Sequence, residues 1–130
     1  MSAIIEKHIP EEMWKAAIKQ VVTTSGSLPV VIKLARSQIS IDEMDLIATM
    51  EILNHSPEKE LPQMCSHSSQ ENTPYGLDRE LKIYTNRDLS RANYVSDILF
   101  KAGIVKLKKV INPMSGKEVN GTKLRQEWCW

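Results

Sequence analysis

The chain has 130 residues, of which 42% are hydrophobic and 25% are charged, and its formal net charge is +1. This composition excludes a wholly disordered chain, and two cysteines are too few for a disulfide framework in a chain of this size. Residues 1–77 hold six Lys or Arg against ten Asp or Glu, whereas residues 78–130 hold eleven against six. Either one half faces a polyanion, or the two halves attract each other, or two solvated surfaces carry a chance bias.

Length and hydropathy set the expected class and location. A chain of this length predicts one domain, with a helical appendage at most. The longest apolar runs fall far short of a membrane span, and we see no basic, apolar and small-residue leader at the start. We therefore expect a cytoplasmic protein that has reduced thiols and no membrane contact.

Residues 1–54 form the first predicted part, which is helical and is expected to serve dimerisation or contact with a protein partner. The first helix begins near Pro10, because proline and the two following acids suit the positive end of a helix. A second helix is expected from Pro29 to about Ser37, although the β-branched run from Val30 to Ile32 makes a strand a real alternative.

The last helix of this part is predicted over about residues 41–54. Ser40 and Glu43 have the spacing of a capping box, in which each side chain bonds the other's backbone N–H. The helix is apolar on nearly every face, so we expect it to be the central buried helix.

Residues 55–76 form the second predicted part, a polar loop rich in turn-forming residues. Its lack of periodicity predicts the most mobile internal segment. Residues 77–130 form the third part. Leu77 to Tyr84 can be a short helix or, through its last four residues, a short strand, and Thr85 to Asp88 is similar to a capping box that starts the next helix.

The most informative stretch runs from Ser90 to the last residue. Four apolar residues lie at helical spacing and are expected to point inward: Val95, Ile98, Leu99 and Ala102. Gly103 follows, where a left-handed helix end favours glycine. The pattern then alternates as in a strand, turns over residues 112–117 and continues as a second extended stretch, whose terminal tryptophans are expected to close over the core.

Polar groups gather on the outer side of this helix. A helix that enters the major groove of DNA needs short polar and basic side chains at its N-terminal end. The candidates of this kind are Arg87, Ser90, Arg91, Asn93 and Tyr94. An ordinary solvated face is about equally consistent with any one of them.

The hairpin that follows is basic. Its cations are Lys106, Lys108, Lys109, Lys117, Lys123 and Arg125, against the single acid Glu118. A segment that lies along the phosphate backbone needs this kind of charge, which is independent of base sequence. The alternative is that the hairpin contains an edge strand, whose lysines prevent it from pairing with a strand of another molecule. We expect Lys106 and Lys108 to share one surface with Arg91.

Enzyme chemistry has little support in the sequence. Cys65 and His67 are one pair with metal-ligand potential, but no second pair lies at ligand spacing, and no base is placed to activate the thiol. We expect no enzyme activity, no metal and no cofactor.

Residues 88–130 resemble the winged helix-turn-helix regulators of bacteria, most nearly the small regulators of fimbrial operons. The resemblance lies in the entry Arg91–Tyr94, the exit Lys101–Val105, the basic hairpin and the terminal tryptophans. It implies a mainly α fold with a C-terminal β-hairpin (α+β), a winged helix-turn-helix with an N-terminal helical extension.

The implied function is a small DNA-binding transcriptional regulator of bacterial, plasmid or phage origin. Its recognition helix would lie in the major groove of double-stranded DNA and its basic wing on the backbone, and a homodimer would read two half-sites. The alternative is a protein-binding modulator, an inhibitor or adaptor that uses the winged helix as a scaffold. A continuous positive strip favours DNA, whereas lysines dispersed among acids beside an exposed apolar patch favour a protein partner.

Overall fold

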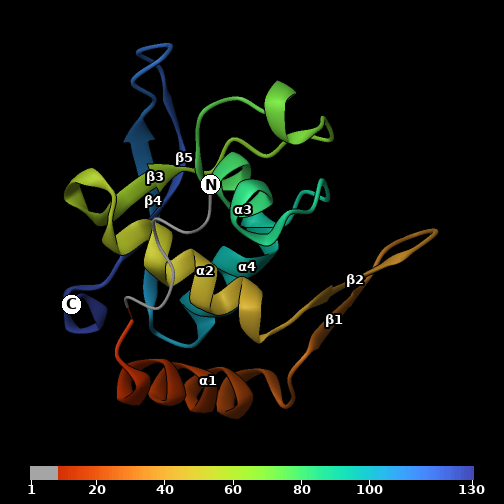
Figure 1. Ribbon diagram of the computed structural model, residues 1–130, viewed down its shortest axis with the longest axis vertical. Helices are drawn as coiled ribbons and strands as arrows, with labels where there is room; N and C mark the ends of the chain where they lie inside the picture. The colour runs from red at the N-terminus through yellow and green to blue at the C-terminus, as the bar shows by residue number, and fades with distance from the viewer. Residues whose placement is uncertain (1–8) are drawn as a thin grey trace.

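The structure is a computed structural model that describes residues 9–130. Over this range the chain is an α+β fold of four α-helices and two small antiparallel sheets (Figure 1). Helix α1 (Glu11–Ser25) begins after Pro10, as the sequence predicts, and ends at Gly26 with a left-handed φ of 88°. It buries Ala17 and Val21 against the rest of the chain, and the side-chain amide of Gln20 donates to the Ala102 carbonyl at the end of α4 (Ala92–Lys101).

The helix predicted from Pro29 to about Ser37 is wrong, and the strand alternative is confirmed. Strands β1 (Val30–Lys33) and β2 (Gln38–Ile41) pair as an antiparallel hairpin that projects from the body at the right of Figure 1. A strand suits the β-branched run because alternate residues face opposite sides. Ile39 and Ile41 are buried by that alternation, while Gln38 and Ser40 are exposed.

Helix α2 (Glu43–Asn54) is the central buried helix, as predicted. Its capping box, however, lies two residues beyond the predicted pair. The Asp45 N–H donates to Asp42 Oδ1 and the Asp42 N–H donates to Asp45 Oδ2, both at 3.1 Å. Ser40 cannot cap the helix because it still belongs to strand β2.

Residues 55–76 are more structured than the predicted polar loop. They contain two 3₁₀ turns (Pro57–Lys59 and Gln70–Asn72) and the short strand β3 (Glu60–Pro62). Strand β3 pairs with β5 (Glu118–Leu124) at the edge of a three-stranded sheet in the order β3-β5-β4. Proline fits there because an edge strand can leave one N–H position unused.

Helix α3 (Leu77–Thr85) settles the helix-or-strand alternative in favour of the helix. The prediction that the next helix starts within Thr85 to Asp88 is wrong. Thr85 is the last residue of α3, and Asn86 ends that helix with a left-handed φ of 53°. Helix α4 starts at Ala92 and its four predicted apolar residues are buried, so the predicted inner face is confirmed.

The predicted C-terminal hairpin is formed by β4 (Val105–Ile111) and β5, which pair antiparallel over their full length. The prediction that the extended stretch continues to the last residue is wrong, because a 3₁₀ turn covers Gln126–Trp128. Both terminal tryptophans still pack against the core. The backbone of Trp130 exchanges two hydrogen bonds of 3.0 Å with the side chain of Asn54, which fixes this terminus to the end of α2. Among the described residues, no helix combines the length and hydropathy needed to cross a membrane.

Candidate nucleic-acid interface

The outer face of α4 lies between the two hairpins of the molecule. In Figure 1 the β4–β5 hairpin projects upward and the β1–β2 hairpin projects to the right, with α3 and α4 between them. Asn93 is exposed on this face, and Tyr94 is half-buried. Two hollows flank the helix, and Asn93 lines both of them.

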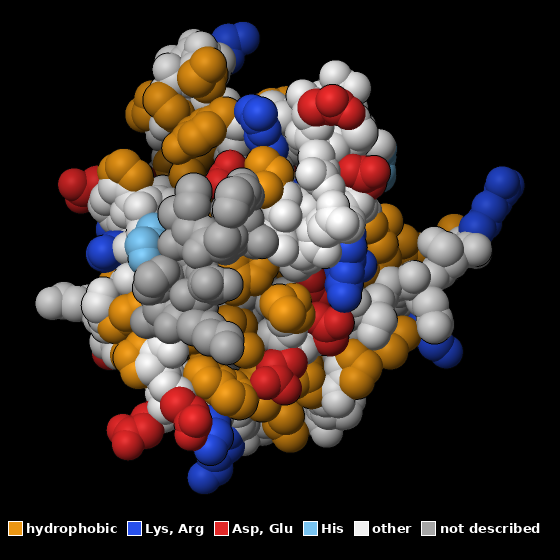
Figure 2. All heavy atoms as spheres, viewed as in Figure 1, with side chains coloured by type: hydrophobic (Ala, Val, Ile, Leu, Met, Phe, Trp, Pro, Cys, Tyr) orange, Lys and Arg blue, Asp and Glu red, His pale blue; other side chains and the backbone are white. Residues whose placement is uncertain are grey.

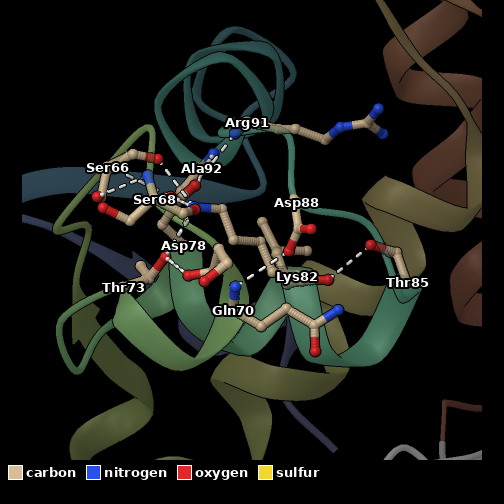
Figure 3. A network of polar contacts seen from close by, with 12 residues as sticks. Ser66, Ser68, Gln70, Thr73, Asp78, Lys82, Thr85, Asp88, Arg91 and Ala92 are labelled. Carbon is tan, nitrogen blue, oxygen red and sulfur yellow. Dashed lines mark hydrogen bonds and ion pairs between the residues drawn. The ribbon is translucent and has the colours of Figure 1, made fainter.

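The position of α4 is fixed by Asp78, a fully buried residue of α3 (Figure 3). Its Oδ1 atom accepts the backbone N–H groups of Arg91 and Ala92, each at 3.1 Å. The first turn of a helix has N–H groups without partners inside the helix, so Asp78 caps α4 from the preceding helix. This contact sets the turn between α3 and α4, and it leaves neither of these N–H groups free for an external phosphate.

Lys82 extends the same network into the polar segment before α3. Its buried ammonium lies 3.3 Å from Asp78 Oδ2. It also donates to the carbonyl oxygens of Ser66 and Ser68 and to Thr73 Oγ1, each at 2.8 Å. Asp78 Oδ2 in turn accepts the Ser66 N–H at 3.2 Å. A buried lysine is tolerated only with such partners, and here they hold residues 66–73 against α3.

The structure corrects the placement of Arg91. The residue is only 8% exposed, and its Nη1 atom donates to both carboxylate oxygens of Asp45 at 3.0 Å. In Figure 3 the guanidinium points away from the network that its backbone joins. The expectation that Arg91 shares an exposed surface with Lys106 and Lys108 is therefore wrong, because Asp45 in α2 draws the side chain into the body of the molecule.

Arg87 is also held by acids. Its guanidinium lies 3.4 Å from Asp42 and 3.6 Å from Asp45. Its side chain is 38% exposed, so it borders the surface but points toward the cap of α2. The pKa of Asp42 is lowered: loss of water raises it, but hydrogen bonds from Asp45 and Arg87 outweigh that effect.

The hairpin lysines divide between the two faces of the sheet. Lys106 and Lys108 alternate with Leu107 and Lys109 along β4, so the two pairs point to opposite sides. On the first side, Lys108 and Lys123 lie 3.1 and 3.8 Å from Glu60 of β3.

The second side of the hairpin faces α4, because Thr122, opposite Leu107, contacts Ser96 of the helix at 2.7 Å. Lys109 lies on this side with its ammonium 2.7 Å from Asn120 Oδ1, and Lys117 is exposed beyond it near the hairpin turn. Arg125 lies at the base of the hairpin, 3.5 Å from Glu127.

A cleft of about 470 Å³ separates α4 from this second side of the hairpin. Its wall is rich in amide side chains and includes Lys109. The lining residues are Gln63, Asn93, Asp97, Leu107, Lys108, Lys109, Asn120 and Gly121. The one acid, Asp97, forms an ion pair of 3.0 Å with Lys101. Amides donate and accept hydrogen bonds at once, so the cleft suits a polar ligand that offers both kinds of group.

The second hollow, of about 370 Å³, lies between the N-terminal end of α4 and the β1–β2 hairpin. Ser90 and Tyr94 line it together with Cys65 and His67. Cys65 is exposed as a residue, but neighbouring protein atoms partly exclude water from its thiol and raise its pKa, and the charge of Asp78 adds to this effect. Within residues 9–130, no three His, Cys, Asp or Glu side chains come together in a way that could hold a metal ion.

The structure thus brings only part of the predicted set to one surface. Ser90, Asn93, Tyr94, Lys108 and Lys109 line the two hollows beside α4. The other six candidates are buried, paired with acids, on the far side of the hairpin or, in the case of Lys117, exposed near its turn. Sequence reasoning missed Gln63 and Asn120, whose amides complete the cleft. The available signal was that Asn120 and Thr122, two residues apart in β5, share one face of the strand.

Comparisons with protein-family models, curated proteins and solved structures find no match to this chain.

Proposed function

We propose that this protein is a small DNA-binding transcriptional regulator and that its residues from α2 onward form a winged helix-turn-helix. The order of elements supports the proposal: α2, β3, α3, α4, β4, β5, with β5 between β3 and β4 in the sheet. In this arrangement α3 and α4 are the helix-turn-helix, α4 is the recognition helix, and the β4–β5 hairpin is the wing.

The observation that carries the proposal is the amide-rich cleft between α4 and the hairpin, with Lys109 in its wall. Asn93 is an exposed residue in the first turn of α4, where a recognition helix contacts base edges, and an asparagine amide can pair with adenine. Lys109 and Lys117 are exposed along the hairpin and would bind backbone phosphates. Lys101 neutralises Asp97, which reduces its repulsion of phosphate.

Binding of a random-sequence duplex, measured by fluorescence anisotropy at about 50 and 200 mM salt, tests the proposal. The informative variant is Lys109→Ala with Lys117→Ala. If each lysine contacts one phosphate, the slope of log affinity against log salt falls by about 0.9 per contact. Replacing Asn93 instead reduces preference among sequences, by roughly 1–3 kcal/mol at one base position.

The matched control is Lys106→Ala with Lys123→Ala. It removes the same charge from the first side of the same hairpin, and neither of these two lysines lines the cleft. We expect the control to keep most of the parent's affinity. Equal losses in the two double variants would mean attraction by net charge alone and would overturn the assigned surface. No duplex binding by the parent at low salt would overturn the function.

A protein-binding modulator is the second candidate, favoured by the same hairpin. The carboxylate of Glu60 partly offsets the positive charge of Lys108 and Lys123. Near the turn of the hairpin, the apolar residues Ile111 and Met114 are 62% and 76% exposed. Exposed apolar side chains of this size mark contact surfaces when they are contiguous. Absence of duplex binding by the parent at low salt is the result that favours this candidate.

A further inference from the structure

The β1–β2 hairpin is an arm with a fixed base and a free tip. At its base Ile39 and Ile41 are 5% and 0% exposed and belong to the core, and Val30 and Ile32 pack against it. At its tip the Leu34 N–H donates to the Ser37 carbonyl at 2.8 Å, and residues 33–38 are all exposed. The arm is therefore held by its inner face and presents its tip to solvent.

The charge of the arm has one sign. Between Gly26 and Ile41 the charged residues are Lys33 and Arg36, both exposed, with no acid among them. Neither forms an ion pair with any residue of the range 9–130. Figure 2 shows the arm at the right with Lys and Arg side chains at and near its outer end. These cations differ from Lys108 and Lys123, which Glu60 already engages.

The arm and α4 share the hollow of about 370 Å³. From the arm come Leu34, Ser37 and Ile39, and from α4 come Asn93 and Tyr94. No acid lines this hollow, although α4 has the acid Asp97 on its other side, in the cleft that faces the wing. A polyanion that lies along the outer face of α4 therefore meets positive charge on both flanks.

We propose that the β1–β2 hairpin is a second nucleic-acid arm, in which Lys33 and Arg36 bind backbone phosphates on the side of α4 opposite the wing. This inference rests on the proposed function, because it takes double-stranded DNA on α4 as the occupant. An arginine fork suits a phosphate bidentately and a lysine supplies a point charge. The contacts carry no base information and serve to orient the duplex on α4.

The test is the double variant Lys33→Ala with Arg36→Ala, compared with the parent on the same random-sequence duplex. Two lost contacts lower the salt slope by about 1.8 units, which corresponds to roughly 60-fold weaker binding near 0.1 M salt. The matched control, Lys15→Ala with Lys19→Ala, removes the same charge from exposed positions of α1. Thermal unfolding of each variant checks that the fold is retained, as is expected for exposed side chains.

The outcomes of this experiment distinguish a failure of the arm proposal from a failure of the proposed DNA-binding function. The arm is supported if its double variant loses affinity and slope well beyond the α1 control. It is overturned, with the function intact, if the arm variant matches the α1 control while the Lys109 and Lys117 double variant still weakens binding. If the parent binds no duplex at low salt, both proposals fall together.

Discussion

Replacing Asp78 with alanine should destabilise this protein more than any surface substitution, because one carboxylate holds three segments together. It accepts the N–H groups of Ser66, Arg91 and Ala92 and faces the ammonium of Lys82. Hydrogen bonds to a charged group contribute about 1.5–3 kcal/mol each, and breaking a buried ion pair from one side costs about 3–5 kcal/mol. These contributions overlap, since each includes the same unpaired lysine and amides.

We therefore expect Asp78→Ala to lower the free energy of unfolding by about 3–5 kcal/mol, a large share of the roughly 5–15 kcal/mol of a typical domain. Urea unfolding followed by circular dichroism measures the change. Asp97→Ala is the control: its ion pair with Lys101 is half exposed on α4, so we expect a loss below about 1 kcal/mol.

A double-mutant cycle with Lys82→Met isolates the buried pair. Once Asp78 is absent, removing the ammonium no longer breaks an ion pair, so the double variant should lose less than the sum of the single losses, by roughly 1 kcal/mol or more. Asp78→Ala within about 1 kcal/mol of the parent would refute the role of this carboxylate. Single losses that add to within about 0.5 kcal/mol would refute the coupling between the two residues.

Three further substitutions or reactions test other parts of the fold. Ile98→Ala empties a core position that is 5% exposed and should cost about 2–5 kcal/mol in urea unfolding. Gly121→Ala would place a Cβ atom 2.5 Å from a methyl carbon of Val110, so we expect a loss of about 1–3 kcal/mol that is smaller in a Val110→Ala background. Partial loss of water around the thiol and the charge of Asp78 raise the pKa of Cys65, so this thiol should react with iodoacetamide more slowly near pH 8 in the folded than in the urea-unfolded protein. Asp78→Ala should reduce the difference between the two reaction rates.

The elements that the sequence predicts well are those whose pattern is local. The apolar spacing of α4, the glycine after it and the strand that follows that glycine are each marked by residues close together in the sequence, and all three are confirmed. Strand β3 was missed because three residues ending in proline carry no periodicity. Its pairing is set by β5, about sixty residues later in the chain.

Candidate site residues were harder to predict because burial of a charge depends on a distant partner. Arg91 precedes a helix, where a basic residue is typical of a DNA-reading surface, but its side chain pairs with Asp45, 46 residues upstream. Nothing near Asp45 in the sequence marks it as that partner. The loop before α3 shows the same effect, since the serine and threonine groups that predict mobility are those that surround Lys82.

The uneven charge of the sequence therefore has a different meaning in three dimensions. Two cations of the basic half, Lys82 and Arg91, are buried and hold the helices in place, so they add nothing to a binding surface. Two cations of the acidic half, Lys33 and Arg36, are exposed on the hairpin beside α4. The exposed cations of the two hairpins that flank α4 thus come from both halves of the chain. Variants on the two hairpins, compared with charge-matched controls, are therefore the sharpest probe of the proposed DNA interface.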